Sequence, residues 1–196
     1  MNRGYHEIKE HGKREFPFNI YPCSIPVDFS HVALHWHEEM EIIAVKKGKG
    51  RITVDTVSYP VEEGDILAVF PGQLHAISCG NGERMEYENI IFRLSMLMGD
   101  NGDGCTVHFL KPLQEGQAKN PVLIQRNQPD HEVFGKVIQE LDRFSEIRGN
   151  GYQLAVKGQL FLFLYYAYGR GILFTEKKPG HAREKIKGIL EYIREH

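Results

Sequence analysis

Residues 35–50 read HWHEEMEIIAVKKGKG and join a cluster of histidines and carboxylates to an apolar run. The run from Met40 to Val45 is typical of a short buried strand, and the glycines that follow it indicate a turn. Side chains two residues apart on a strand point to the same face. His35 and His37 are therefore expected to point together, and Glu41 shares their parity if the strand continues.

Downstream of this run the sequence alternates between short strands and turns. Residues 51–59 place Ile52 and Val54 on one face and polar side chains on the other, which predicts a half-buried strand. Further strands are predicted over residues 66–70 and 85–94, each bounded by turns that contain glycine or proline. Several short strands at close spacing indicate an antiparallel barrel or sandwich.

The candidate site combines this cluster with His75, which follows the predicted strand over residues 66–70 and can come from an adjacent strand. Three imidazoles and one carboxylate form a natural ligand set for zinc, nickel, iron or manganese, with positions left open for water or a ligand. Histidines that line a barrel can also hydrogen-bond a ligand, or each other, without any metal. We therefore expect His35, His37, Glu41 and His75 to lie in a ligand pocket, with a bound divalent metal as one of the two alternatives.

Other side chains are weaker candidates for this pocket. His31 shares the strand parity of His35, and the aromatic lining of the pocket is sought among Tyr21, Phe70 and Phe92. The remaining histidines show no ligand spacing and are interpreted as surface or core residues: His6, His11, His108, His131, His181 and His196.

The periodicity of the apolar residues changes after Pro129. Apolar residues from Val133 to Phe144 recur at spacings of three and four, which predicts an amphipathic helix. A second helix, over residues 152–168, is apolar on nearly all sides and must be covered, so we favour a homodimer through these helices. Residues 183–196 begin a third amphipathic helix that stops in the middle of its pattern, which suggests that a further domain follows.

Composition and charge argue against several classes of protein. The 196 residues carry 24 Lys and Arg against 26 Asp and Glu, a net charge of −2, whereas a free-standing nucleic-acid-binding domain is usually clearly basic. The three cysteines lie far apart and form no CxxC pair, which argues against a zinc knuckle or a disulfide framework. The longest apolar run, residues 160–168, is too short to cross a bilayer, and the N-terminus lacks a signal peptide. We expect a cytoplasmic protein with no membrane partner.

The spacing from His35 to Gly48 resembles the first motif of the cupin family. His35, His37, Glu41 and Gly48 stand at the positions of that motif, although Phe29 occupies the place of its opening glycine. The resemblance implies a double-stranded β-helix, a jelly-roll-like barrel. It also implies that His35, His37 and Glu41 occupy metal positions.

The second cupin motif is matched more loosely. Gly64, Pro71 and His75 stand near their expected places, and His75 takes the fourth metal position. Gly72 directly follows the proline, and Cys79 occupies the place of the usual asparagine.

The chain as a whole resembles the N-terminal portion of AraC-type transcription regulators. The order of several phrases carries this resemblance: His-Trp-His from residue 35, Glu-Ile-Ile from 41, Glu-Gly-Asp-Ile-Leu from 63 and Pro-Gly-x-x-His from 71. The phrases FLKPL, at 109–113, and GYQLAVK, at 151–157, follow in the same order. Residues 186–196, IKGILEYIREH, resemble the first helix of the DNA-binding domain of that family.

This resemblance implies a domain layout. Residues 1–15 are a flexible N-terminus, 16–120 a cupin-like effector-binding barrel, 121–176 a helical dimerisation and coupling segment, and 177–196 a linker with the start of a truncated DNA-binding domain. The predicted fold is thus mostly β, a cupin barrel followed by α-helices.

The function implied is that of a sensor and not of an enzyme. A small molecule, with sugars as the class that the family suggests, binds in the barrel of a homodimer, and DNA is contacted only through the missing C-terminal domain. The alternative is a metal-dependent cupin enzyme, such as a dioxygenase or a sugar isomerase or epimerase. The unfinished terminal helix favours the regulator.

Overall fold

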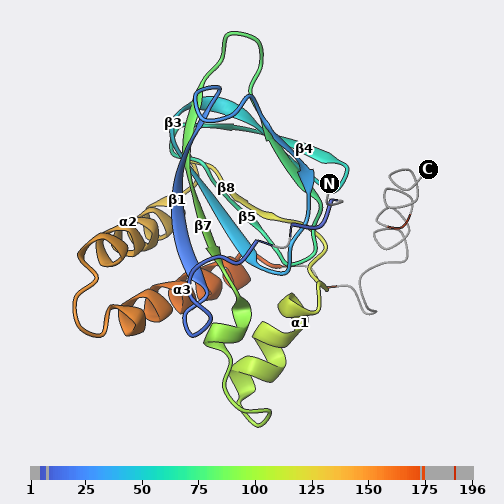
Figure 1. The fold of residues 1–196 in the computed structure, drawn as a ribbon. Helices are drawn as coiled ribbons and strands as arrows, with labels where there is room; N and C mark the ends of the chain where they lie inside the picture. The colour runs from blue at the N-terminus through green and yellow to red at the C-terminus, as the bar shows by residue number, and fades with distance from the viewer. Residues whose placement is uncertain (1–4, 8, 173, 175–187, 189–196) are drawn as a thin grey trace.

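The chain forms a barrel from two antiparallel sheets, with helices covering one of them (Figure 1). A computed structural model describes residues 5–7, 9–172, 174 and 188. The first sheet has the strand order β1 (Phe18–Ile25), β7 (Met85–Phe92), β3 (Met40–Val54), β5 (Ile66–Val69) and β8 (Val122–Ile124). The second sheet has the order β2 (Val32–His35), β6 (His75–Ser78), β3 and β4 (Val57–Glu62). The predicted cupin-type antiparallel barrel is confirmed.

Strand β3 belongs to both sheets and joins them. Up to Gly48 it pairs with β7 and β5, and beyond Gly48 it pairs with β4 and β6. The register with β7 shifts between Val45 and Lys47, and Gly48 has a φ of +78°. A Cβ at Gly48 would lie 2.1 Å from the carbonyl oxygen of Arg84. The glycines therefore mark a bend in a continuous strand, and the turn predicted there is wrong.

The strand predicted over residues 51–59 is a hairpin instead. β3 ends at Val54 and β4 begins at Val57, with Asp55 at a φ of +52° in the turn between them. Ile52 and Val54 are buried as predicted. Pro60 lies inside β4, which it can do because β4 is an edge strand among the described residues and pairs there only with β3.

The continuous apolar run of β3 reflects burial on both faces of the first sheet. Ile43 and Val45 point into the barrel, whereas Met40 and Ile42 point to the opposite face, against the helices. Strands covered on both faces read as unbroken apolar segments. Glu41 has the parity of Ile43, so it also points into the barrel.

The helices lie on the outer face of the first sheet (Figure 1). α2 (His131–Ile147) and α3 (Tyr152–Gly169) are the two predicted helices. They are joined by a turn in which Arg148 and Gly151 adopt left-handed backbone conformations. The short helices η1 (Leu94–Leu97), η2 (Thr106–Leu110) and α1 (Lys111–Gln114) connect β7 to β8. No described helix is long and apolar enough to cross a membrane.

Two boundaries of the predicted layout differ in detail. β8 pairs with β5, so the sheet continues past the boundary expected at residue 120. Part of the N-terminus expected to be flexible packs on the barrel, since the amide of Trp36 donates to the carbonyl of Tyr5 and the amide of Glu7 donates to the carbonyl of Trp36. The helix expected over residues 183–196 lies outside the described residues, apart from Gly188.

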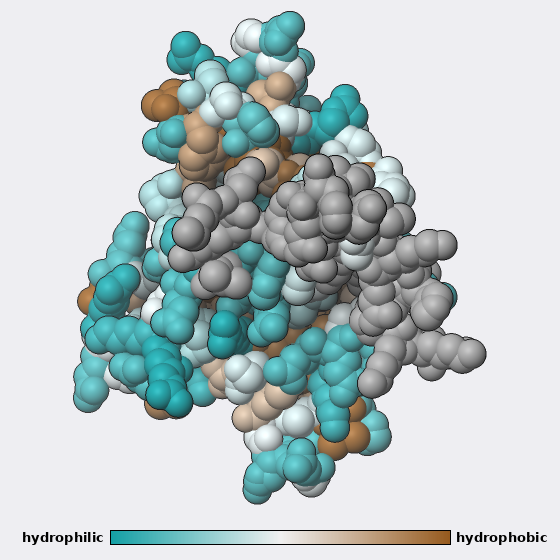
Figure 2. All heavy atoms as spheres, turned by 45° about the vertical axis from the view of Figure 1, so that its right-hand side comes forward, coloured by the Kyte–Doolittle hydropathy of each residue, from teal (hydrophilic) through white to brown (hydrophobic). Residues whose placement is uncertain are grey.

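Polar side chains dominate the face of the molecule shown in Figure 2, and hydrophobic residues appear there in small groups.

Candidate metal centre and ligand cavity

The four predicted site residues meet inside the barrel and form what we term the His/Glu cluster: His35, His37, Glu41 and His75. One potential ligand atom from each lies within 4.8 Å of all the others. His35 ends β2 and faces His75 at the start of β6, and Glu41 comes from β3. His37 lies in the connection between β2 and β3, so the two histidines do not share one strand as expected. They converge because the chain turns between them and Glu41.

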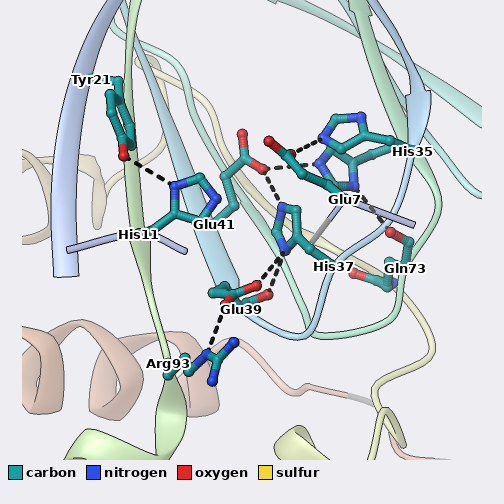
Figure 3. Close-up of polar contacts among 10 residues, drawn as sticks. Glu7, His11, Tyr21, His35, His37, Glu39, Glu41, Gln73 and Arg93 are labelled. Carbon is teal, nitrogen blue, oxygen red and sulfur yellow. Dashed lines mark hydrogen bonds and ion pairs between the residues drawn. The ribbon is translucent and has the colours of Figure 1, made fainter. Parts of the chain in front are cut away.

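Glu41 is the centre of the cluster (Figure 3). Its Oε2 lies 3.0 Å from Nε2 of His37 and 2.9 Å from Nε2 of His75. Nε2 of His35 lies 3.4 Å from Oε2 of Glu7, at the edge of the cluster. His37, Glu41 and His75 are buried, and His35 is partly exposed.

Each histidine of the cluster is anchored through its other ring nitrogen. Nδ1 lies 2.9 Å from the carbonyl oxygen of Ala33 for His35, 3.1 Å from that of Glu39 for His37 and 3.0 Å from that of Gln73 for His75. A carbonyl oxygen can only accept, so each Nδ1 carries a proton. Nε2 is therefore the nitrogen presented to the centre, which is how metal-binding histidines are held in proteins.

The electrostatics of the cluster follow from burial and pairing. Burial alone would raise the pKa of Glu41, but His75 and His37 outweigh it and hold that pKa well below its usual range. Burial opposes the charged form of His37, yet the hydrogen bond that its Nε2 makes to the carboxylate of Glu41 raises the His37 pKa. Burial and the neighbouring His75 lower the pKa of His35 to about 4. An anionic carboxylate thus faces imidazoles that compete for positive charge.

The donor set of the cluster fits a divalent cation. Three nitrogens and one carboxylate oxygen suit zinc, nickel, iron or manganese. Bonds of about 2.1 Å place ligand atoms on opposite sides of an ion at most about 4.2 Å apart. Ligand atoms within 4.8 Å of one another would therefore close in slightly around an ion.

Two further side chains hold the His/Glu cluster in place. Glu39 is buried, and its Oε1 accepts a hydrogen bond of 2.8 Å from Nε of Arg93. This pair fixes the backbone carbonyl that anchors His37. Gln73 is buried as well, and its Oε1 accepts from the amide of Phe70, which shapes the turn before His75.

A cavity of about 430 Å³ opens from the cluster toward the barrel mouth. His35 and Glu41 form part of its wall, and Tyr21 and His31 line it as the sequence suggested. Phe70 and Phe92 lie instead in the apolar core on the opposite face of the sheet. Sequence reasoning missed further lining residues, which include Glu7, Lys9, His11, Cys23, Tyr87 and Asn89.

Comparison with known proteins places the chain in a family. Residues 26–164, most of the chain, match the family described as AraC-like ligand binding domain. A curated relative, an uncharacterized HTH-type transcriptional regulator, YdeC, of Bacillus subtilis strain 168, is 27% identical over 88 residues. The match covers 44% of this chain and 30% of that protein, so less than a third of the relative's length is represented.

Solved structures with related folds share little sequence with the chain. ToxT from Vibrio cholerae O395 is 17% identical with a TM-score of 0.47, over 92% of this chain and 64% of that one. A cupin 2 conserved barrel domain protein from Salinispora arenicola CNS-205 is 23% identical with a TM-score of 0.37, over 41% of this chain and 66% of that one. With most of its length matched to one family description, the chain belongs to the AraC-like ligand-binding domain family.

Proposed function

We propose that this chain is the effector-binding part of a DNA-binding transcription regulator. The observation that carries the proposal is a cavity that opens on the His/Glu cluster, in a chain that belongs to a family of ligand-binding domains. The name of the curated relative, an HTH-type transcriptional regulator, supports the regulatory role. DNA would be contacted by a separate domain of the whole protein and not by this chain.

The cavity binds a small-molecule effector beside a divalent metal ion. His35, His37, Glu41 and His75 hold the ion, with zinc, nickel, iron and manganese as the candidate metals. When bound, the ion supplies a Lewis-acidic position for an oxygen ligand. Sugars are the effector class that the family resemblance suggests.

The helices couple ligand binding in the barrel to the rest of the protein. α2 is tied to the barrel where Nε2 of His131 lies 2.7 Å from the carbonyl oxygen of Gly64 and where Lys46 donates to Asp142 at 2.9 Å. Arg170, directly after α3, binds the carboxylate of Asp130 with two hydrogen bonds. A structural change in the barrel can therefore reach the end of α3 through these polar contacts.

The function is tested on the full-length gene product. Operator DNA binding is measured by fluorescence anisotropy, with and without candidate effectors, on the metal-loaded protein. Allosteric coupling of about 1–3 kcal/mol predicts a change in DNA affinity of about 5–150-fold. A protein that binds no DNA, or binds it equally with every effector that occupies the cavity, would remove the regulator proposal.

α3 is the proposed dimer contact. Leu154, Phe161, Leu162 and Tyr165 are 77%, 40%, 43% and 71% exposed. With Gly158 they form a stripe at spacings of three and four residues, where the absent side chain of the glycine lets a second helix approach closely. An exposed apolar stripe of this kind is typical of an interface.

Leu162→Lys should therefore shift the protein from dimer to monomer, because a lysine at the centre of the stripe buries an unpaired charge. Sedimentation velocity at micromolar concentration measures the shift. Val57→Lys changes an exposed apolar residue on β4 and serves as the matched control. A wild-type chain that is monomeric under these conditions would contradict the proposed dimer.

A metal-dependent enzyme is the second candidate, because His35 and Glu41 face an open cavity and the ligand set suits metal catalysis. Turnover of a carboxylic acid or sugar by the metal-loaded chain, lost in Glu41→Gln, would favour the enzyme.

A further inference from the structure

The cavity contains three buried polar atoms whose hydrogen-bonding capacity is not filled by strong partners among the described residues: two have no partner, and the third has only the thiol of Cys23 beside it. They are the hydroxyl oxygen of Tyr87, Nε2 of His11 and Oδ1 of Asn89. Tyr87 is 1% exposed and His11 is 5% exposed, and all three residues line the cavity. Buried polar atoms in folded proteins nearly always have a partner. The three atoms therefore indicate where the polar groups of a ligand bind.

The placement of these atoms requires more than one polar group on the ligand. Tyr87 and Asn89 are two residues apart on β7 and point to the same face, so they are separated by about 6.5–7 Å along the strand. His11 approaches from the N-terminal segment, beside Tyr21. A ligand that satisfies all three must carry oxygen atoms on several carbons.

The three groups differ in the hydrogen bonds that they offer. The phenol of Tyr87 can donate, and the amide oxygen of Asn89 can only accept. The hydroxyl of Tyr21 lies 3.2 Å from Nδ1 of His11. When Tyr21 donates to Nδ1, the neutral ring carries its proton on Nε2. The cavity then presents two free donors and one free acceptor.

A lysine lies near the donor side of the cavity, whereas two of the lining carboxylates already have partners. Asp28 accepts from the amide of Ser24, and Glu41 pairs with His37 and His75. Nζ of Lys9 lies 4.7 Å from the ring centroid of Tyr21, and no carboxylate of the described residues forms an ion pair with it. Positive charge near two free donors suits a carboxylate, and the free acceptor suits a hydroxyl.

We propose that the cavity takes a small hydroxycarboxylate of the sugar-acid kind. Its carboxylate accepts from Tyr87 and His11 near the ammonium of Lys9, and a hydroxyl donates to Asn89. The inference rests on the proposed function, because it takes the barrel cavity as the effector site.

Two probes of equal chain length test the ligand class: gluconate and its neutral counterpart glucitol. Isothermal titration calorimetry is run on the zinc-loaded chain and on the chain freed of metal by chelation. Gluconate should bind at least about tenfold more tightly, because charge-assisted hydrogen bonds are about twice as strong as neutral ones. Lys9→Gln should lower gluconate affinity and leave glucitol unchanged. Lys13→Gln, on the same segment but outside the cavity lining, is the matched control.

Tyr87→Phe tests the contact itself, because it removes only the hydroxyl. We expect about a tenfold loss of gluconate affinity, with thermal stability unchanged or raised. Tyr165→Phe, on the exposed face of α3, should change neither. A gain in stability without any loss of affinity would show that the hydroxyl does not bind the ligand.

The outcomes separate the inference from the proposed function. Equal affinity for the two probes, or no binding of either, would overturn the hydroxycarboxylate assignment. A parallel zinc titration that still shows one tight site would leave the proposed metal centre standing. A zinc titration of the wild-type chain that shows no binding would instead count against the proposed function.

Discussion

At the scale of single residues, Glu41 is the side chain on which the candidate centre depends. It is 2% exposed, and one of its oxygens lies within 3.0 Å of Nε2 of both His37 and His75. Glu41→Gln removes the only carboxylate of the cluster. Mutation of a residue that merely hydrogen-bonds to a metal ligand typically costs about 10–100-fold in metal affinity, and the loss of zinc affinity in Glu41→Gln should be larger. Competition with a chromophoric chelator measures the loss. Glu38→Gln, an exposed neighbour, should keep wild-type affinity, and equal losses in the two variants would contradict the assigned ligand role.

Cysteine reactivity reports on the wall of the cavity. Burial raises the pKa of Cys23 to about 11, so its thiolate is about a thousandth of the population at pH 8. Cys105 is exposed. Iodoacetamide at pH 8 should therefore modify Cys105 first and Cys23 far more slowly, with Cys23 accelerating as the pH rises. Peptide mass spectrometry follows both sites, and equal rates would show that the cavity wall is open.

The four residues of the His/Glu cluster could be predicted from sequence because the spacing of His35, His37 and Glu41 is short and specific. Tyr87 and Asn89 were within reach of the same reasoning, since they share the inward parity of their predicted strand. His11 was not, because it enters the barrel on an irregular segment that has no periodicity to interpret.

At the scale of elements, the contact between the sheet and α2 contains a lysine that forms ion pairs with two carboxylates. Nζ of Lys46 lies 2.5 Å from Oε2 of Glu88 and 2.9 Å from Oδ2 of Asp142. Burial raises the pKa of Glu88, and Asp142 adds to this while Lys46 opposes it. The lysine therefore keeps two neighbouring carboxylates from repelling each other.

Lys46→Met should lower the free energy of unfolding by about 1–2 kcal/mol near pH 8, less than for a fully buried pair because the three side chains are partly exposed. A carboxyl group with a raised pKa costs stability above that pKa and regains it on protonation. The loss of stability in Lys46→Met should thus shrink as the pH falls and Glu88 takes up a proton. Urea unfolding of the variant and the wild type at pH 8 and pH 5 measures this loss. Lys136→Met, which removes an exposed pair with Glu132, should leave the free energy of unfolding nearly unchanged at both pH values.

The elements that could be predicted are those with a clear period. α2 was predicted because its apolar residues recur every three or four positions over several turns. The β3–β4 hairpin was missed because Asp55 and Thr56 make its turn without glycine or proline. Gly48 was misread because a bend within a strand and a turn between strands use the same residue.

At the scale of the whole molecule, metal binding should stabilise the fold, since an ion that binds only the folded chain shifts the unfolding equilibrium. A hundredfold excess of zinc over its Kd should raise Tm by about 5–10 °C. The His37 pKa is raised above its ordinary value of 6.5, so protons begin to compete with the ion for this side chain above that pH. The rise in Tm caused by zinc should therefore fade as the pH falls from 8 to 5. Differential scanning fluorimetry with zinc, and with EDTA as reference, measures this. An equal gain in Glu41→Gln would place the ion elsewhere.

The packing of residues 5–7 and 9–16 on the barrel has a practical consequence for anyone who purifies this protein. Glu7, Lys9 and His11 line the cavity. A polyhistidine tag fused ahead of them would bring extra imidazoles to the threshold of the site and add its own metal to every titration. Affinity handles therefore belong at the opposite end of the chain, or must be cleaved before ions or effectors are measured.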